Sequence, residues 1–413
     1  MAGRHGGLFL VLLALVALPS PAGAVTEFPL PDPPGQPGFN SQPAGLAVGP
    51  DGALWFTEEN AHAIGRITTS GTITEFQLQT PFAGPSEITA GPDGALWFTE
   101  FGANPPRIGR ITTAGELNES FQLPSGSGPD GITAGPDGAI WYTLSGANKI
   151  GRIPTTGPQI PEEFPLPLEG FTPGDITPGP DGRLWFTEPS PADKIGAITT
   201  AGVPTLYDLP PGTDPSGIAA SAANMWFTEN KNDIGPGEIG RISVLGIPIT
   251  HFGPTGDGPS GIAFGSDGAL WFTESVSNRI GRMTTSGSIT SFAIPTPGSQ
   301  PGTIVAGPDG AMWFTEKAGD KIGRIDVGGS GGSFVPTPFT PPKAVTPASK
   351  SKSKCRVPKV RGLSVRKAGK KLRRAGCRYR VRGKGKVVST KPRAGSRTAK
   401  RVEVRAKLKR RPR

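Results

Sequence analysis

Short apolar segments alternate with polar turns along most of the chain, and one such segment recurs. At its clearest it reads GPDGALWFTE. In Gly-Pro-Asp-Gly the proline fixes φ and the second glycine can take a positive φ, which is typical of a tight turn. Leu-Trp-Phe-Thr places mostly apolar side chains on both faces of a strand. This is expected where neighbouring sheets cover both faces.

Each repeat contains enough short segments for four strands. In the second repeat we expect strands at residues 86–90, 95–99, 107–111 and 117–123. The last of these is the most polar, which favours an outer position in its sheet.

All seven tryptophans lie in this phrase, at successive spacings of 42, 44, 44, 41, 45 and 42 residues. They are Trp55, Trp97, Trp141, Trp185, Trp226, Trp271 and Trp313. A period in the low forties built from short strands is typical of one propeller blade per repeat. The pattern therefore predicts an all-β domain over residues 25–327, a seven-bladed β-propeller of four-stranded blades. Ligands would bind at the mouth of its central channel.

Two segments compete for one strand position in this ring. The seventh repeat supplies only three strands, over residues 303–325. Residues 25–30 read VTEFPL and match the outer strand of a blade, so we expect them to complete the last blade. Residues 333–339 are a rival for the same position. Closure removes the exposed sheet edges that promote aggregation.

The first 24 residues have the pattern of a secretory signal. Arg4 and His5 precede an apolar run at residues 8–18, and Ala22-Gly23-Ala24 is a small-residue cleavage site. The run is too short to span a bilayer, and no later segment is apolar enough to do so. We expect an exported bacterial protein, secreted or associated with the cell wall, monomeric, and without a transmembrane segment in the mature chain.

Charge divides the chain into two unlike parts. The net charge is +11, but 29 of the 44 Lys and Arg and only one of the 33 acids lie from Pro341 onward, giving +28 there and −17 before it. Such asymmetry indicates a basic module with an anionic partner. A solvated basic tail is the simpler alternative. Nucleic acid is disfavoured because Tyr379 is the module's only aromatic residue for base stacking.

The C-terminal part has a fold-like pattern of its own. Residues 328–354 form a linker rich in Gly, Pro and Ser, and residues 409–413 form a basic tail. Between them we expect a small α+β domain at residues 355–408. Its helix, residues 364–375, is capped by Ser364. Its strands are expected at residues 377–381, 386–390 and 402–408.

The motif order in this segment resembles a PASTA domain. V-P-x-V-x-G precedes the helix, A-G-C follows it, and V-x-S-x-x-P-x-x-G comes later. The matching residues are Val357, Pro358, Val360, Gly362, Ala375, Gly376, Cys377, Val388, Ser389, Pro392 and Gly395. This resemblance implies binding of peptidoglycan through residues 355–413. The excess of basic residues favours teichoic acid or another anionic cell-wall polymer.

The only two cysteines, Cys355 and Cys377, flank the first part of this domain. An isolated pair in an exported chain is more often a disulfide than a metal site. We therefore expect a disulfide between them.

Three segments of the propeller repeats carry a family resemblance: GPDGALWFTE, ANKIGRI at residues 147–153 and RITTSGTITEF at residues 66–76. In these segments the chain resembles the virginiamycin B lyase (streptogramin lyase) family. The resemblance covers residues 25 to about 326 and implies a seven-bladed propeller. It also implies a lyase that opens cyclic streptogramin B antibiotics by elimination at an ester linkage, with Mg²⁺ as cofactor. Such an elimination needs a general base and an electrophile.

The family's catalytic histidine belongs to a Pro-His-Gly-Ile phrase at the start of the last blade, and a second histidine occupies the same slot one blade earlier. Here those slots hold Gly302 and Ser260, and Gln300 replaces the Glu that precedes the catalytic histidine. Glu316 lies near the family's other Glu, one residue out of register, and is a metal-ligand candidate. In order, the seven slots hold Ala44, Ser86, Asp130, Gly174, Ser216, Ser260 and Gly302. The chain therefore has no confident catalytic residue.

Two histidines remain in the mature chain, and neither restores this chemistry. His62 is expected in a loop, and His251 is expected to face solvent from an outer strand.

Without histidines, the candidate functional residues at the expected mouth of the central channel are acidic. A Glu follows the Trp strand in six repeats, and we expect it to cap strand ends or to pair with the repeated Arg of the third strand. The Asp of Gly-Pro-Asp-Gly is expected to form the turn. Glu87, Asp130 and Asp175 break the repeat and are better candidates for binding a ligand. They would suit a divalent cation or a cationic group.

Three functions are compatible with these residues. The first is a wall-associated protein that binds a ligand or partner, which the missing histidines favour. The second is an enzyme, either a streptogramin B lyase-like carbon–oxygen lyase with a carboxylate base and a divalent cation, or a lactonase-like hydrolase. The third is a scaffold without a small-molecule site.

Overall fold

The computed structural model divides into two compact units, Met1–Pro341 and Pro342–Arg413. In the first, it describes residues 23–32, 36–167, 172–189, 191–231 and 236–328. In the second, it describes residues 355–356, 359, 364, 367–368, 370, 372, 379–382, 386–391, 397–398 and 402–407. Most of the expected signal, the linker from residue 329, residues 333–339, Cys377 and the basic tail lie outside these ranges. No helix within them is long and apolar enough to cross a bilayer.

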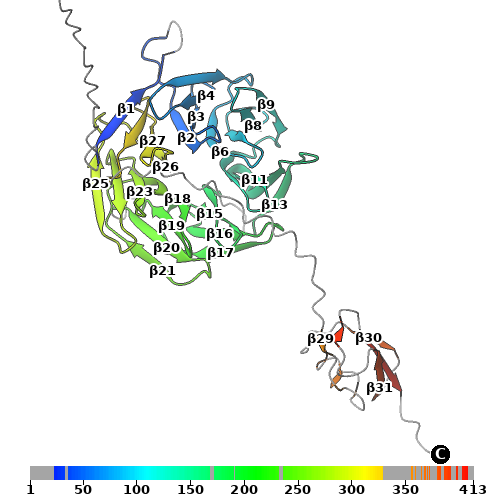
Figure 1. Ribbon diagram of the computed structural model, residues 1–413. Helices are drawn as coiled ribbons and strands as arrows, with labels where there is room; N and C mark the ends of the chain where they lie inside the picture. Colours follow the sequence, from blue (N-terminus) through cyan, green and yellow to red (C-terminus); the bar gives the residue numbers. More distant parts are fainter. Residues whose placement is uncertain are drawn as a thin grey trace, which may run out of the picture. The chain divides into compact units, whose positions relative to one another are not determined.

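Seven four-stranded antiparallel sheets form the first unit, as the tryptophan spacing predicted (Figure 1). Blades 1 and 2 consist of β2 (Pro43–Val48), β3 (Leu54–Glu58), β4 (Ala63–Ile67), β5 (Ile73–Gln77), β6 (Pro85–Ala90), β7 (Ala95–Glu100), β8 (Arg107–Thr112) and β9 (Leu117–Gln122). Blades 3 and 4 consist of β10 (Pro129–Ala134), β11 (Ala139–Leu144), β12 (Lys149–Pro154), β13 (Glu162–Pro165), β14 (Ile176–Pro178), β15 (Leu184–Glu188), β16 (Lys194–Ile198) and β17 (Pro204–Asp208), with a 3-10 turn η1 (Ser145–Ala147).

Blades 5 and 6 repeat this plan. Their strands are β18 (Pro215–Ala220), β19 (Asn224–Glu229), β20 (Glu238–Ser243), β21 (Ile249–Phe252), β22 (Pro259–Phe264), β23 (Leu270–Glu274), β24 (Arg279–Met283) and β25 (Ile289–Ala293). Blade 7 consists of β26 (Pro301–Ala306), β27 (Met312–Glu316), β28 (Lys321–Ile325) and β1 (Val25–Pro29).

The ring is closed by the N-terminal strand. β1 pairs antiparallel with β28, from Val25 opposite Ile325 to Pro29 opposite Lys321. This confirms that residues 25–30 supply the fourth strand of the last blade. Pro301 lies at the channel end of the strands of blade 7, and the paired residues Val25 and Ile325 lie at the other end. The chain therefore enters and leaves the propeller on the same side of this blade.

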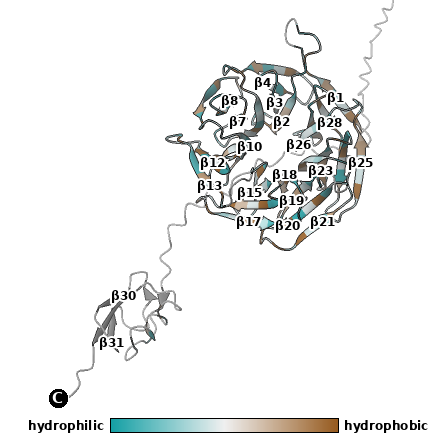
Figure 2. Cartoon of the chain, turned by 180° about the vertical axis from the view of Figure 1, so that it is seen from behind, coloured by the Kyte–Doolittle hydropathy of each residue, from teal (hydrophilic) through white to brown (hydrophobic). Residues whose placement is uncertain are grey.

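The core lies between the blades. The tryptophans are at most 2% exposed, and each belongs to a cluster with Leu or Phe side chains of the following blade, as Trp55 does with Leu96 and Phe98. Each also packs on an aromatic ring of its own outer strand, with ring centroids 5.2–5.7 Å apart. The expectation that the Trp strand is buried on both faces is therefore confirmed. The outer strands carry both hydrophobic and hydrophilic residues (Figure 2).

The repeated arginine pairs with the turn aspartate, so the expected pairing with the Glu after the Trp strand is wrong. In blade 1, Arg66 Nε lies 2.7 Å from Asp51 Oδ2, and the Trp55 indole N–H donates to Asp51 Oδ1 at 3.1 Å. Four other blades repeat the ion pair with Arg110–Asp93, Arg152–Asp137, Arg282–Asp267 and Arg324–Asp309. The turn role is also present, because the same Asp oxygen accepts from the backbone N–H two residues later. One carboxylate thus joins the turn, the Trp and the third strand.

The second unit is an α+β domain. β29 (Cys355–Arg356) pairs with β32 (Arg397–Thr398). β33 (Val402–Lys407) lies parallel to β30 (Tyr379–Arg382) and antiparallel to β31 (Lys386–Lys391). Helical residues include Ala368 and Leu372, both at most 1% exposed. The Ser364 hydroxyl accepts a long hydrogen bond from Lys367 N–H at 3.4 Å, as its expected capping role requires. The disulfide stays a prediction because Cys377 is outside the described residues.

Candidate functional site

A cavity of about 780 Å³ lies at the centre of the ring, and the starts of the first strands line much of it. The seven slot positions identified in the sequence all contribute. They are Ala44, Ser86, Asp130, Gly174, Ser216, Ser260 and Gly302. The sequence register therefore located the cavity wall.

The backbone directs these positions toward the channel. In six of the seven first strands the pairing register shifts just after the initial proline, for example between Pro85 and Ile88. Such a bulge bends the strand and re-aims the side chains beside it. In blade 2 the side chains re-aimed in this way are Ser86 and Glu87.

Glycine limits how many side chains enter the channel. At the position after the slot, a Cβ on Gly45, Gly131, Gly217 or Gly261 would lie 2.4–2.6 Å from a carbonyl oxygen of the next blade. Side chains occur at this position only in the other three blades, as Glu87, Asp175 and Thr303. The chemistry of the cavity therefore depends on few groups.

Threonine hydroxyls from six of the seven blades link neighbouring blades around the cavity wall, and the sequence pattern did not predict these bonds. Thr143 Oγ1 accepts from Gly131 N–H at 2.9 Å in its own blade and donates to the Gly174 carbonyl at 2.8 Å in the next blade. Thr57, Thr99, Thr228 and Thr273 make the same pair of hydrogen bonds. Thr315 donates to the Ala44 carbonyl at 2.9 Å, which links the last blade to the first.

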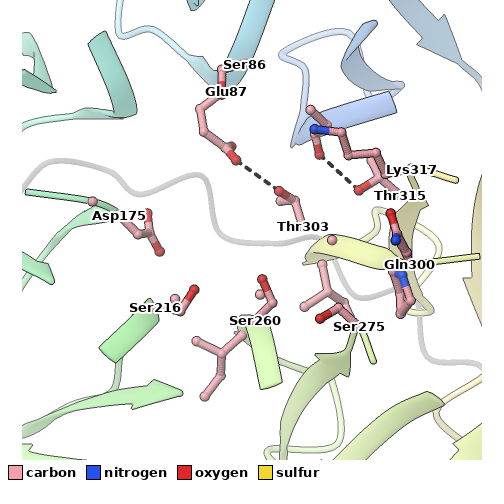
Figure 3. Close-up of a pocket in the computed structure, with 18 of the residues that line it drawn as sticks. Ser86, Glu87, Asp175, Ser216, Ser260, Ser275, Gln300, Thr303, Thr315 and Lys317 are labelled. Carbon is pink, nitrogen blue, oxygen red and sulfur yellow. Dashed lines mark hydrogen bonds between the residues drawn. The ribbon is translucent and has the colours of Figure 1, made fainter. Parts of the chain in front are cut away.

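Three carboxyl groups come together in the cavity wall from blades 2, 3 and 4. Glu87 and Asp175 point into the cavity, with Thr303 facing Glu87 (Figure 3). Thr303 Oγ1 donates to Glu87 Oε1 at 3.2 Å. Asp175 accepts backbone N–H bonds from Ile176 at 2.7 Å and Ile218 at 2.8 Å. Asp130 lines the same cavity.

Burial and mutual repulsion raise the pKa values of these three carboxyl groups to different extents. Burial, then the charges of Asp175 and Asp130, raise the pKa of Glu87 to about 8. Burial raises the pKa of Asp175 to about 6, against its two backbone hydrogen bonds. Burial also raises the pKa of Asp130. At neutral pH the Glu87 carboxyl is therefore mostly protonated, while Asp175 is mostly ionised.

The opposite wall, from blades 5 to 7, carries hydroxyl and amide groups. Ser216, Ser260, Gln300 and Thr303 line it (Figure 3). Lys317 also lines the cavity, but its ammonium pairs with Glu59 Oε2 at 2.5 Å. Among the described lining residues this wall has no carboxylate, and Mg²⁺ prefers oxygen ligands that include carboxylates. The residues at the Ser260 and Gly302 positions thus do not fit a magnesium ion.

Glu316 does not line this cavity. It is fully buried, like the five other Glu that follow a Trp strand, none of which is more than 1% exposed. Burial, then Glu27, raise its pKa to about 7. Burial also raises the pKa of Glu58 and of Glu100 to about 8. The predicted strand-end role appears in blade 6, where Glu274 Oε1 accepts from Gly256 N–H at 2.9 Å.

Neither described histidine lines the cavity. His62 lies between β3 and β4, as expected for a loop residue, and its Nδ1 accepts from Gly84 N–H at 3.2 Å. His251 lies exposed on the outer strand β21, as expected, and its Nδ1 also lies 2.7 Å from Oε1 of the buried Glu229.

Comparisons with known proteins match both units. The model of the virginiamycin B lyase family matches residues 16–106, 38–253 and 234–352, and that of the PASTA domain matches residues 356–407. A streptogramin B lyase structure is 36% identical, with a TM-score of 0.66 over 74% of this chain and 99% of that one. A second structure is a catalytically inactive His-to-Ala variant of virginiamycin B lyase from Staphylococcus aureus with quinupristin. It is 37% identical, with a TM-score of 0.65 over 73% and 98%. A comparison with curated proteins found no match.

Proposed function

The chain belongs to the virginiamycin B lyase family, and from that starting point we propose that it is an exported, wall-associated binding protein. Its propeller cavity would hold a ligand. Residues 355–413 would attach it to peptidoglycan or an anionic cell-wall polymer, since the PASTA match suggests peptidoglycan-related binding and this segment is strongly basic.

The observation that carries the proposal is the content of the two slots that hold histidine in the family. Ser260 and Gly302 occupy them, both line the cavity, and none of the described lining residues is a histidine. In the related S. aureus enzyme, replacement of one histidine by alanine accompanies catalytic inactivity. Without an imidazole this site lacks the usual general base for elimination.

The ligand would carry positive charge. Three of the cavity's side chains are acidic, and its lysine is already paired with Glu59. A cationic group beside them would offset the charges of Asp130 and Asp175 and favour the ionised form of Glu87. These three carboxylates do not gather closely enough to form a preformed three-ligand metal group within the described residues. An organic cation therefore fits better than a tightly held metal ion.

The test is a degradation assay with a streptogramin B antibiotic, with and without Mg²⁺, on the full-length protein and on Gly302→His. We expect no turnover by the natural chain. Turnover comparable to that of an active family member would overturn the proposal. Wall attachment is tested separately by sedimentation with purified cell wall, which we expect to be lost when residues 355–413 are deleted.

A second candidate is an enzyme with a carboxylate base, either a carbon–oxygen lyase or a lactonase-like hydrolase. It is favoured by the different pKa values of Glu87, about 8, and Asp175, about 6, because such a pair can serve as acid and base at neutral pH. Mg²⁺ would then have to bind on the acidic wall. A turnover that is lost in both Glu87→Gln and Asp175→Asn would establish this alternative.

A further inference from the structure

Blade 5 carries a compact cluster of metal-ligand side chains away from the channel. Glu229 ends β19, Glu238 begins β20 and His251 lies in β21. His251 Nδ1 is 2.7 Å from Glu229 Oε1 and 3.9 Å from Glu238 Oε2, and the three ligand atoms lie within 4.8 Å of one another. Since Glu229 pairs with Glu238 and Gly240 pairs with His251 in one sheet, the backbone fixes their positions.

A positive charge already occupies this place. Lys231 Nζ lies 3.3 Å from Glu229 Oε2 and 3.1 Å from Glu238 Oε2. Glu229 is fully buried, and a buried carboxylate needs a compensating cation. The ammonium therefore balances the two carboxylates that a bound cation would use. The Lys231 side chain is 22% exposed, so it has a route to solvent.

The cluster is specific to blade 5. His251 lies opposite the glycine of the third strand, and in five other blades the residue opposite that glycine is not histidine. Those residues are Glu27, Glu75, Glu163, Leu206 and Ser291. A feature that departs from the repeat is not required for building a blade.

We propose that Glu229, Glu238 and His251 bind a zinc ion, which displaces the Lys231 ammonium. One imidazole nitrogen and two carboxylate oxygens are a zinc ligand set, and a fourth position stays open for water. Bonds of about 2.0–2.1 Å in a tetrahedron place ligand atoms about 3.4 Å apart. The observed separations of 2.7 and 3.9 Å bracket that value, so small side-chain shifts complete the site.

The test is calorimetric titration of the tag-free, full-length protein with Zn²⁺. We expect one zinc ion per chain, a higher melting temperature with zinc, and at least tenfold weaker binding in His251→Ala. Lys231→Met should bind more tightly, because the competing ammonium is gone. His62→Ala is the matched control and should bind as the natural chain does.

Absence of zinc binding, or equal binding by His251→Ala, would overturn the site. Weaker zinc binding by Lys231→Met would show that zinc does not displace the Lys231 ammonium. Because the site is separate from the cavity, neither result depends on the proposed function.

Discussion

The hydroxyl of Thr303 in the seventh blade donates a hydrogen bond to the carboxyl of Glu87 in the second, at 3.2 Å. This bond lowers the pKa of Glu87 against the larger effect of burial. In Thr303→Val we expect that pKa to rise further, because the ionised form loses a donor. Carboxyl carbon NMR across a pH titration measures it. Ser275→Ala, another cavity hydroxyl, is the control, and an unchanged Glu87 pKa in Thr303→Val would contradict the role.

Substitution by alanine should cost more stability at Gly261 than at Gly302. A Cβ on Gly261 would lie 2.5 Å from the Gly302 carbonyl oxygen, whereas one on Gly302 meets only the Thr315 hydroxyl, at 3.0 Å. We expect Gly261→Ala to lose roughly 2 kcal/mol or more of unfolding free energy. Gly302→Ala should lose clearly less in the same urea denaturation. Equal losses would show that the blades adjust more freely than their packing indicates.

In blade 4 the arginine comes from the turn before the Trp strand and not from the third strand. Arg183, just before β15, pairs with Asp181 at 2.5 Å and lies over Trp185, while the usual third-strand position holds Ala197. Arg183→Ala should cost about 1–2 kcal/mol, because the ion pair and the stacking on Trp185 are both lost.

The double variant Arg183→Ala with Ala197→Arg should recover part of this loss by restoring the arrangement of the other blades. Thermal denaturation of the single and double variants checks both values. A double variant no more stable than Arg183→Ala would rule out the exchange.

Buried Glu58 and Glu100 should make the fold less stable as the pH rises from about 4.5 to about 8. Burial raises the pKa of each to about 8. Between the ordinary pKa near 4.5 and about 8, the unfolded chain releases these protons while the folded chain retains them. Their contribution therefore falls as pH rises through that window.

We expect Glu58→Gln to be roughly 1–3 kcal/mol more stable than the natural chain at pH 9, and not at pH 4. Denaturant unfolding at both pH values measures this. The exposed Glu116→Gln is the control. A benefit of equal size at both pH values would disprove a protonated Glu58.

Deletion of residues 25–30 should open the ring. It exposes the β28 edge, which β1 covers over five paired residues. We expect a large fall in melting temperature and a tendency to aggregate, measured by calorimetry and light scattering. Deletion of residues 333–339 is the matched control. If that deletion has the larger effect, the closure described above is incorrect.

Much of this architecture could be predicted from local pattern. The Gly-Pro-Asp-Gly turns, the strand residues and the tryptophan period depend on neighbours in sequence, and all three were found in the structure. The slots from Ala44 to Gly302 were also located correctly, because they keep a constant register to the strand that follows.

The contacts that the sequence did not reveal join separate strands or blades. Thr143 looks like an ordinary strand residue until its hydroxyl meets the Gly174 carbonyl of the next blade. Glu316 looks like a polar strand end, yet its side chain is fully buried. The partner of Arg66 is a turn residue fifteen positions earlier, which local periodicity cannot distinguish from the nearer glutamate.

In blade 7 the third strand and the outer strand come from the two ends of the propeller chain, yet they pair as the connected strands of the other blades do. Val25 faces Ile325 as Ile73 faces Ile67 in blade 1, where residues 68–72 connect the two strands. A turn of that length would link the native ends without disturbing a strand pair. New ends could then be placed in the loop before any other blade, so this propeller suits circular permutation, and the choice of starting blade is not imposed by the fold.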